Sequence, residues 1–147
     1  MATGITKWYQ KGKAHYYKGD MGDFESDTFK AVLLSSSYTP NQQTDETWAD
    51  CSAYEVSGTG YTAGGLELAN KTVTDSSLVI TLDCDDFEWA SSTITAKTCV
   101  IVHQAGASLA SGDYLLCYIS ADANQSSSGT TFSIPLATTG LLSDTVS

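Results

Sequence analysis

Short apolar segments separated by turn-forming residues restrict this chain to a small set of folds. Segments rich in β-branched and aromatic residues recur at intervals of roughly 10 to 15 residues, a spacing typical of β-sandwich strands. The longest apolar runs, AVLL, CVIV and YLLCYI, are far too short to span a bilayer. With 147 residues the chain fits one domain. The sequence therefore predicts an all-β, single-domain β-sandwich, with a jelly roll favoured and an immunoglobulin-like arrangement second.

The expected strands lie within six segments and the N-terminal region, which gives seven or eight strands in all. The six segments are FKAVLLSSSY, LELANKTVT, SLVITLD, STITAKTCVIVHQ, DYLLCYIS and TTFSIPL. We expect DSS, CDDFEWAS, AGASLASG and ADANQSSSG to connect them, the last as a mobile tip. One short helix is expected in NQQTDETWADCSAYEV, with Thr44 or Asp45 as its cap.

Charge is distributed unevenly along the chain. Residues 1–19 contain four lysines and no acid, whereas residues 20–147 contain all seventeen acids and three lysines. We therefore divide the chain into a basic, aromatic N-terminal arm (residues 1–19) and an acidic β-sandwich domain (residues 20–147). The arm shows no sustained period of two or 3.6 residues, so we expect it to be extended.

The aromatic rings of the arm need another surface to cover them. That surface could be the acidic body of the same chain, a neighbouring copy, a different protein or nucleic acid. An acidic body and the absence of arginine disfavour nucleic acid. The plainest alternative is a first strand of the same sheet with a frayed end.

We favour docking of the arm on another subunit, because Trp, Tyr and the aliphatic stems of lysine suit an interface with a wet rim. The residues expected to bind the partner are Lys7, Trp8, Tyr9, Lys11, Lys13, Tyr16, Tyr17 and Lys18.

The stretch EVSGTGYTAGGLELANKTVT contains four glycines among hydroxyl-bearing residues and invites comparison with a phosphate-binding loop. It lacks the lysine and following hydroxyl of a Walker loop, and no helical period follows it. We therefore expect Gly58, Gly60, Gly64 and Gly65 to be turn and bulge positions that need positive φ or a close backbone approach.

No group of residues points to catalysis. His15 and His103 lie outside any recognisable nucleophile motif, and there is no Cys/His cluster. The acids in DCDDFEWA could offer oxygen ligands to calcium, but they lack the spacing of a calcium loop, so we expect solvated acids alternating with buried Phe87 and Trp89. The four cysteines have no C-x-x-C spacing and are expected to be reduced. We expect no enzymatic activity, no cofactor and no bound metal.

Three long stretches of the chain resemble a family of small virion proteins encoded by tailed bacteriophages. They are SSSYTPNQQTDETWADCSAYEVSGTGYTAGGLELANKTVT, DDFEWASSTITAKTCVIVH and LLCYISADANQSSSGTTFSI, with EVSGTGYTAGG the most specific part. The resemblance covers residues 28–142 and does not extend to the basic arm. Members of the family are described as capsid decoration (cement) proteins or as tail-fibre-like proteins.

The resemblance implies a virion structural protein. Cement proteins of this size look like jelly rolls that assemble as trimers on the capsid. We therefore expect a decoration protein that binds the major capsid protein and other copies of itself, with no nucleic acid or membrane partner. No apolar run near the N-terminus resembles a signal peptide, so we expect assembly in the bacterial cytoplasm and a final location in the virion. A tail-fibre or baseplate module with glycan-binding loops is the alternative.

Overall fold

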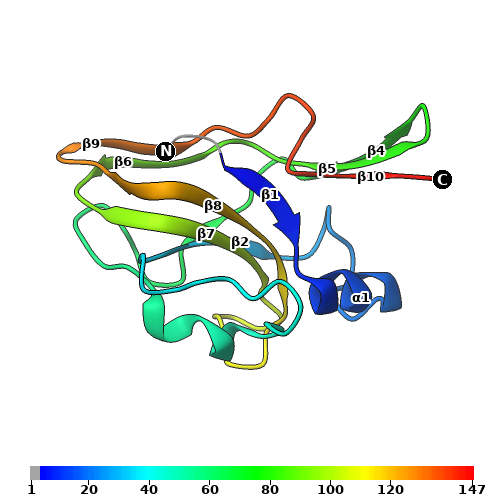
Figure 1. Ribbon diagram of the computed structural model, residues 1–147, viewed down its shortest axis with the longest axis horizontal. Coiled ribbons are helices and arrows are strands. Elements are labelled where there is room, and N and C mark those ends of the chain that lie inside the picture. The colour runs from blue at the N-terminus through cyan, green and yellow to red at the C-terminus, as the bar shows by residue number, and fades with distance from the viewer. Residues whose placement is uncertain (1–3) are drawn as a thin grey trace.

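The computed structural model describes residues 4–147 and shows an all-β fold built from antiparallel sheets (Figure 1), which confirms the predicted class. It contains one α-helix, α1 (Gln10–Lys18), and two short 3₁₀ turns, η1 (Trp48–Asp50) and η2 (Ser52–Tyr54). The strands are β1 (Ile5–Trp8), β2 (Phe29–Leu34), β3 (Leu66–Glu67), β4 (Thr72–Ser76), β5 (Val79–Asp83), β6 (Phe87–Ser92), β7 (Thr95–His103), β8 (Leu115–Ser126), β9 (Thr130–Ile134) and β10 (Leu142–Thr145).

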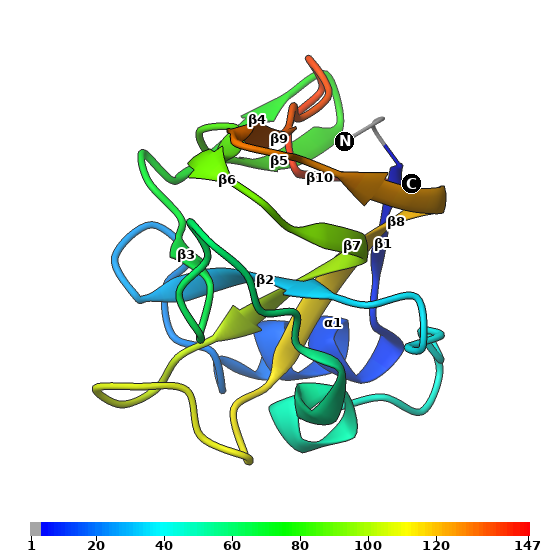
Figure 2. The ribbon, with the colours of Figure 1, turned by 90° about the vertical axis from the view of Figure 1, so that its left-hand side faces the viewer.

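The strands form a five-stranded sheet with the order β1-β8-β7-β2-β3, a three-stranded sheet with the order β10-β5-β4, and the pair β6-β9. The pair β6-β9 and the sheet β10-β5-β4 lie on one side of the five-stranded sheet (Figure 2). Between these layers lies the main core, with buried side chains from β2, β7 and β8 on one side and from β5, β6, β9 and β10 on the other. The jelly-roll order stays a prediction.

The opposite face of the five-stranded sheet is also buried. A second apolar cluster places Tyr9, Tyr38, Trp48 and Cys51 over side chains of β2, β7 and β8. These three central strands are therefore covered on both faces, and this explains why their sequences are continuous apolar runs rather than alternating ones. The segment that contains η1 and η2 forms part of this cover.

The glycine-rich stretch lies in turns and against the sheet, as predicted. Gly58, Gly60, Gly64 and Gly65 all have positive φ. A Cβ atom on Gly65 would collide with the carbonyl oxygen of Ala31 in β2, so only glycine allows the chain to lie this close to the sheet. No helix begins at the last glycine, and the short strand β3 follows instead.

The prediction of an extended N-terminal arm is wrong. Residues 5–8 form an edge strand paired with β8, and residues 10–18 form α1, which ends in a Schellman motif at Gly19. In this motif Gly19 N–H donates to Tyr16 O at 3.1 Å and Asp20 N–H donates to His15 O at 3.0 Å. Because α1 is held by a buried glycine and by polar contacts, no apolar stripe marks it in the sequence.

The helix expected in residues 41–56 is also wrong. Its acids close turns rather than start an α-helix: Asp45 Oδ2 accepts Asn41 N–H, and Asp50 Oδ2 accepts the N–H groups of Glu46 and Thr47. The side-chain acceptors therefore compete with the helical pattern of backbone bonds, and only the two 3₁₀ turns form.

Two expected connectors contain strands. CDDFEWAS includes β6, whose alternating side chains Phe87 and Trp89 are buried as predicted, and ADANQSSSG continues β8 as far as Ser126 instead of forming a mobile tip. The extension of β8 pairs with β7: Ser126 of β8 lies opposite Thr95 of β7, and their hydroxyl oxygens are 2.8 Å apart in a hydrogen bond. Backbone pairing with β7 thus outweighs the weak strand propensity of the polar residues at the end of β8.

Candidate functional site

The N-terminal unit, which we define as residues 5–18 (β1, Tyr9 and α1), contains all eight residues predicted to bind a partner. β1 adds to the edge of the main sheet through β8, with Ile5 opposite Ser120 and Trp8 opposite Cys117. α1 then crosses β8 at very short range, because a Cβ atom on Gly12 would collide with the carbonyl oxygen of Leu115. The unit is therefore an integral part of the fold.

Tyr9 joins the N-terminal unit to the second apolar cluster. Its ring is fully buried and lies 4.9 Å from the ring of Tyr118. The Tyr9 and Tyr38 hydroxyls are 2.6 Å apart, and Tyr38 donates to Asp45 Oδ2 at 2.7 Å, so Tyr9 is the donor to Tyr38. Burial raises the pKa of both phenols, which keeps this chain of hydrogen bonds protonated.

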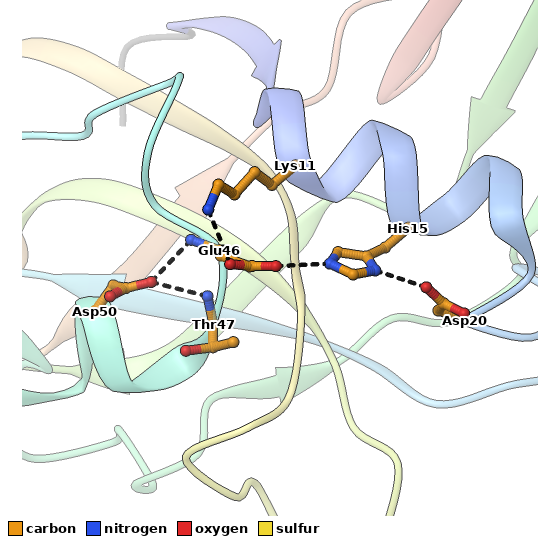
Figure 3. Close-up of polar contacts among 6 residues, drawn as sticks. All are labelled: Lys11, His15, Asp20, Glu46, Thr47 and Asp50. Atoms are coloured by element: carbon orange, nitrogen blue, oxygen red, sulfur yellow. Dashed lines mark hydrogen bonds and ion pairs between the residues drawn. The ribbon is translucent and has the colours of Figure 1, made fainter.

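His15 is held between two carboxylates (Figure 3). Its Nδ1 lies 2.6 Å from Asp20 Oδ2, its Nε2 lies 2.8 Å from Glu46 Oε1, and its ring stacks on Tyr114 at 3.7 Å. A carboxylate can only accept, so both ring nitrogens donate and the imidazole is charged. Although burial lowers the pKa of His15, the hydrogen bonds to Asp20 and Glu46 raise it overall.

Glu46 also binds Lys11, whose Nζ lies 3.0 Å from Glu46 Oε2. The carboxylate thus receives two cations from successive turns of α1. The hydrogen bond from His15, followed by that from Lys11, lowers the pKa of Glu46. This cluster attaches the middle of α1 to the segment before η1.

Lys13 and Tyr17 attach the other side of α1 to β10. Lys13 Nζ lies 2.9 Å from Asp144 Oδ2, and the Tyr17 hydroxyl donates to the same oxygen at 2.6 Å. The Lys13 ammonium also lies 5.4 Å from the ring centre of Trp8 and 5.7 Å from that of Tyr17. The hydrogen bond from Tyr17 and then that from Lys13 lower the pKa of Asp144.

The structure therefore places most of the predicted partner-binding residues on the acidic body of their own chain. Trp8 and Tyr16 pack against the main core, and Tyr9 is buried. Lys7 and Lys18 are exposed and form no ion pair within residues 4–147, and the Tyr17 ring is 67% exposed. Of the surfaces considered for the arm, the acidic body of the same chain is the one that it contacts.

The sequence predicted strands at β5 and at the start of β4 but missed β10, and with it the exposed surface of the projecting sheet, which we define as β10-β5-β4. It extends away from the pair β6-β9 (Figure 1), and, apart from Ile5 and Tyr54, the exposed large apolar residues of the described chain lie on it, directly after it or on the adjoining α1. They are Tyr17, Val73, Leu78, Ile80 and Val146. β4 and β5 are joined by the turn Ser77–Leu78, in which two residues with positive φ stand in place of the usual Asn-Gly. The side chain of Leu78 is exposed to solvent in this turn.

The acidic run before β6 makes separate contacts rather than one site. Asp85 Oδ2 accepts the Asn70 amide at 2.7 Å, and Asp86 Oδ1 accepts Leu136 N–H at 2.7 Å. Within residues 4–147 no group of three or more His, Cys, Asp or Glu side chains is placed to hold a metal ion. His103 is buried, and burial lowers the pKa of its imidazole, which favours the neutral form.

All four cysteines are free thiols, as expected, and all are buried. Cys99 in β7 and Cys117 in β8 lie in the main core, and burial raises the pKa of both. Burial likewise raises the pKa of Cys84 to about 12. The thiols are therefore packing groups that resist ionisation.

The chain matches no protein-family model, no curated protein and no solved structure. Among the described residues, no helix has the length and apolar character needed to cross a membrane.

Proposed function

We propose that the protein is a non-enzymatic virion structural protein of a tailed bacteriophage, and specifically a capsid decoration protein. The resemblance of residues 28–142 to small phage virion proteins is the observation that carries this proposal. The all-β fold agrees with it, and the exposed apolar side chains of the projecting sheet supply a surface that an assembly can cover.

The partners in this proposal are the major capsid protein and other copies of the chain, as a homotrimer. A trimer that contacts several capsomers at once gains avidity from effective concentration, so weak individual contacts can stabilise a shell against internal pressure. Because Lys11 and Lys13 are paired within the chain, the predicted partner-binding residues that stay exposed without an ion pair in the described part of the chain are Lys7, Tyr17 and Lys18, and the exposed Ile5 lies beside them. These residues and the projecting sheet are the surfaces left for partners.

Quantitative mass spectrometry of purified particles tests this function. A decoration protein will be present in a fixed, high ratio to the major capsid protein, and purified protein added to expanded capsids that lack it will bind to saturation. A low copy number confined to tail fractions would instead identify the tail-fibre or baseplate alternative. Absence from purified particles would contradict both.

A further inference from the structure

The outer edge of β4 lacks a strand neighbour and is open to an added strand. β4 pairs with β5 on one side only, and all five of its residues are exposed. The N–H of Val73 points to the open side, where it donates to Glu25 Oε1 at 2.7 Å. Backbone groups alternate in direction along a strand, so those of Asp75 point to the open side as well. No proline, lysine or bulge protects this edge.

The outer edge of β1 also lacks a strand neighbour among the described strands. Tyr9 N–H donates to Leu116 O of β8 at 3.2 Å, so by alternation Lys7 also directs its backbone groups toward β8, while Thr6 and Trp8 direct theirs outward. The Gln42 amide covers the Trp8 carbonyl at 2.8 Å. The backbone N–H and C=O of Thr6 and the N–H of Trp8 can therefore form hydrogen bonds with an added strand.

These two edges complement each other in charge. Lys7 is an exposed lysine and Asp75 an exposed acid, and neither forms an ion pair within residues 4–147. If β1 of one copy lies parallel to β4 of another with Lys7 opposite Asp75, the Asp75 N–H faces the Thr6 carbonyl and the Asp75 carbonyl faces the Trp8 N–H. The two unpaired charges then lie side by side on one face of the joined sheet.

The same register also pairs apolar side chains. It sets Val73, which is 38% exposed, opposite Ile5, which is 77% exposed and is the most exposed large apolar residue described. In this register the turn with Leu78 lies opposite Gln10 of the neighbouring copy. Gln10 borders a groove that Trp8 and Lys13 also line. One alignment therefore uses the outer edges of β1 and β4, the charges of Lys7 and Asp75, and three exposed apolar residues.

We propose that copies of this chain associate head to tail by adding β1 of one copy, in parallel, to β4 of the next, with Lys7 paired to Asp75 and Ile5 packed on Val73. A symmetric antiparallel pairing of two β4 edges centred on Asp75 is disfavoured, because it places Asp75 opposite its own copy. A head-to-tail contact closes into a ring when the rotation between copies permits, as a trimer requires. This deepens the self-association within the proposed function, but its test requires no capsid.

Charge exchange tests this interface. We expect purified wild-type protein to associate in a concentration-dependent way in sedimentation velocity. Lys7→Glu and Asp75→Lys should each raise the dissociation constant about tenfold or more, because each places like charges together. The double variant Lys7→Glu/Asp75→Lys should recover association, and so should an equal mixture of the two single variants. Lys97→Glu and Glu88→Lys are charge-matched controls, since neither residue lies on β1 or β4 and neither forms an ion pair within residues 4–147.

Hydrogen exchange supplies a second measurement on the unmodified chain. Association should slow exchange at Asp75 in β4 and at Trp8 in β1, and dilution should reverse the protection. A wild-type protein that stays monomeric at millimolar concentration would overturn the inference. So would single variants that associate as well as the two controls, because the contact between copies would then lie away from Lys7 and Asp75.

The proposed function and this interface fail in different experiments. Charge-dependent association of a protein absent from virions would leave the interface standing and remove the decoration role. If the protein binds expanded capsids but its self-association does not change in the Lys7 and Asp75 variants, the decoration role stands and the proposed interface is wrong.

Discussion

At the scale of single residues, Gly12 determines how closely α1 approaches the sheet, because a side chain there would meet the Leu115 carbonyl of β8. Helix propensity alone would make Gly12→Ala stabilising by about 1 kcal/mol. The collision opposes this gain, and since overpacking costs roughly 1 to 3 kcal/mol and the obstacle is backbone, we expect a net loss of about 2 kcal/mol. Urea denaturation followed by circular dichroism measures the difference.

Ala14 supplies the matched control for this substitution, because it is exposed in the same helix. Ala14→Gly should lower the free energy of unfolding by about 1 kcal/mol through helix propensity only. A Gly12→Ala protein more stable than wild type would show that α1 is not seated on β8 as described.

Leu78 is the other residue at which backbone geometry decides the effect of substitution. Its φ is +65°, a conformation that costs a side-chain-bearing residue about 1 to 2 kcal/mol, and its side chain is 70% exposed. We expect Leu78→Gly to raise the free energy of unfolding by about 1 kcal/mol, since glycine adopts this turn without strain. Thermal melts will measure the change, and a lower melting temperature would contradict it. The same variant should weaken self-association, because Leu78 is then missing from the interface.

At the scale of the element, the attachment of α1 depends on pH through His15. The pKa of His15 is raised in the folded state, so its contribution to stability is full below the unfolded value of about 6.5 and is lost as pH rises through the folded pKa. The pKa of Glu46 is lowered, so its contribution is present above its ordinary value of about 4.5 and is lost as pH falls through its folded pKa. The attachment is therefore strongest between these two titrations.

We expect His15→Gln to reduce stability by about 1 kcal/mol or less near pH 5.5, with a smaller difference from wild type at pH 8.5. His103 has a lowered pKa and titrates in the opposite sense, but it is present in both proteins and cancels in the difference. Denaturant unfolding at a series of pH values gives the curve. A difference that is constant with pH would mean that His15 acts only through its packing on Tyr114.

The strands that the sequence indicates most directly are those with an uninterrupted apolar run. β2, β7 and β8 are buried on both faces, so the runs AVLL, CVIV and YLLCYI mark them directly. α1 was not predictable, because its contacts are a glycine against a backbone and charges matched to residues far away in sequence. The acids around η1 resembled a helix start, but they bind backbone N–H groups in tight turns.

At the scale of the whole molecule, the separation of charge along the chain reflects how the chain closes on itself. The sequence separates the basic, aromatic residues 1–19 from all seventeen acids, but it does not show which surface the arm contacts. Glu46 and Asp144, which bind Lys11 and Lys13, lie far along the chain and have no local feature that distinguishes them from the other acids. The contact between the arm and its own body could therefore be listed as an alternative but not selected.

Removal of residues 1–18 should abolish cooperative folding rather than only binding. The deletion opens the edge of β8, takes Tyr9 out of the second apolar cluster and leaves Glu46 and Asp144 without their cations. Loss of one fully buried aromatic ring alone costs about 3 to 5 kcal/mol, a large part of the 5 to 15 kcal/mol that stabilises a typical domain. We expect the truncated chain to aggregate or to melt without a sharp transition in circular dichroism.

A synthetic peptide of residues 4–19, added to the truncated chain, should restore part of the cooperative melt, whereas the same peptide with Tyr9→Ala should not. A truncated chain that melts as sharply as wild type would show that the N-terminal unit is dispensable for the fold. Because truncation alters the core as well as the surface, its effect on capsid binding cannot be assigned to docking. The exposed charges of Lys7 and Asp75 avoid this ambiguity, since changing them leaves every described ion pair and both apolar clusters intact.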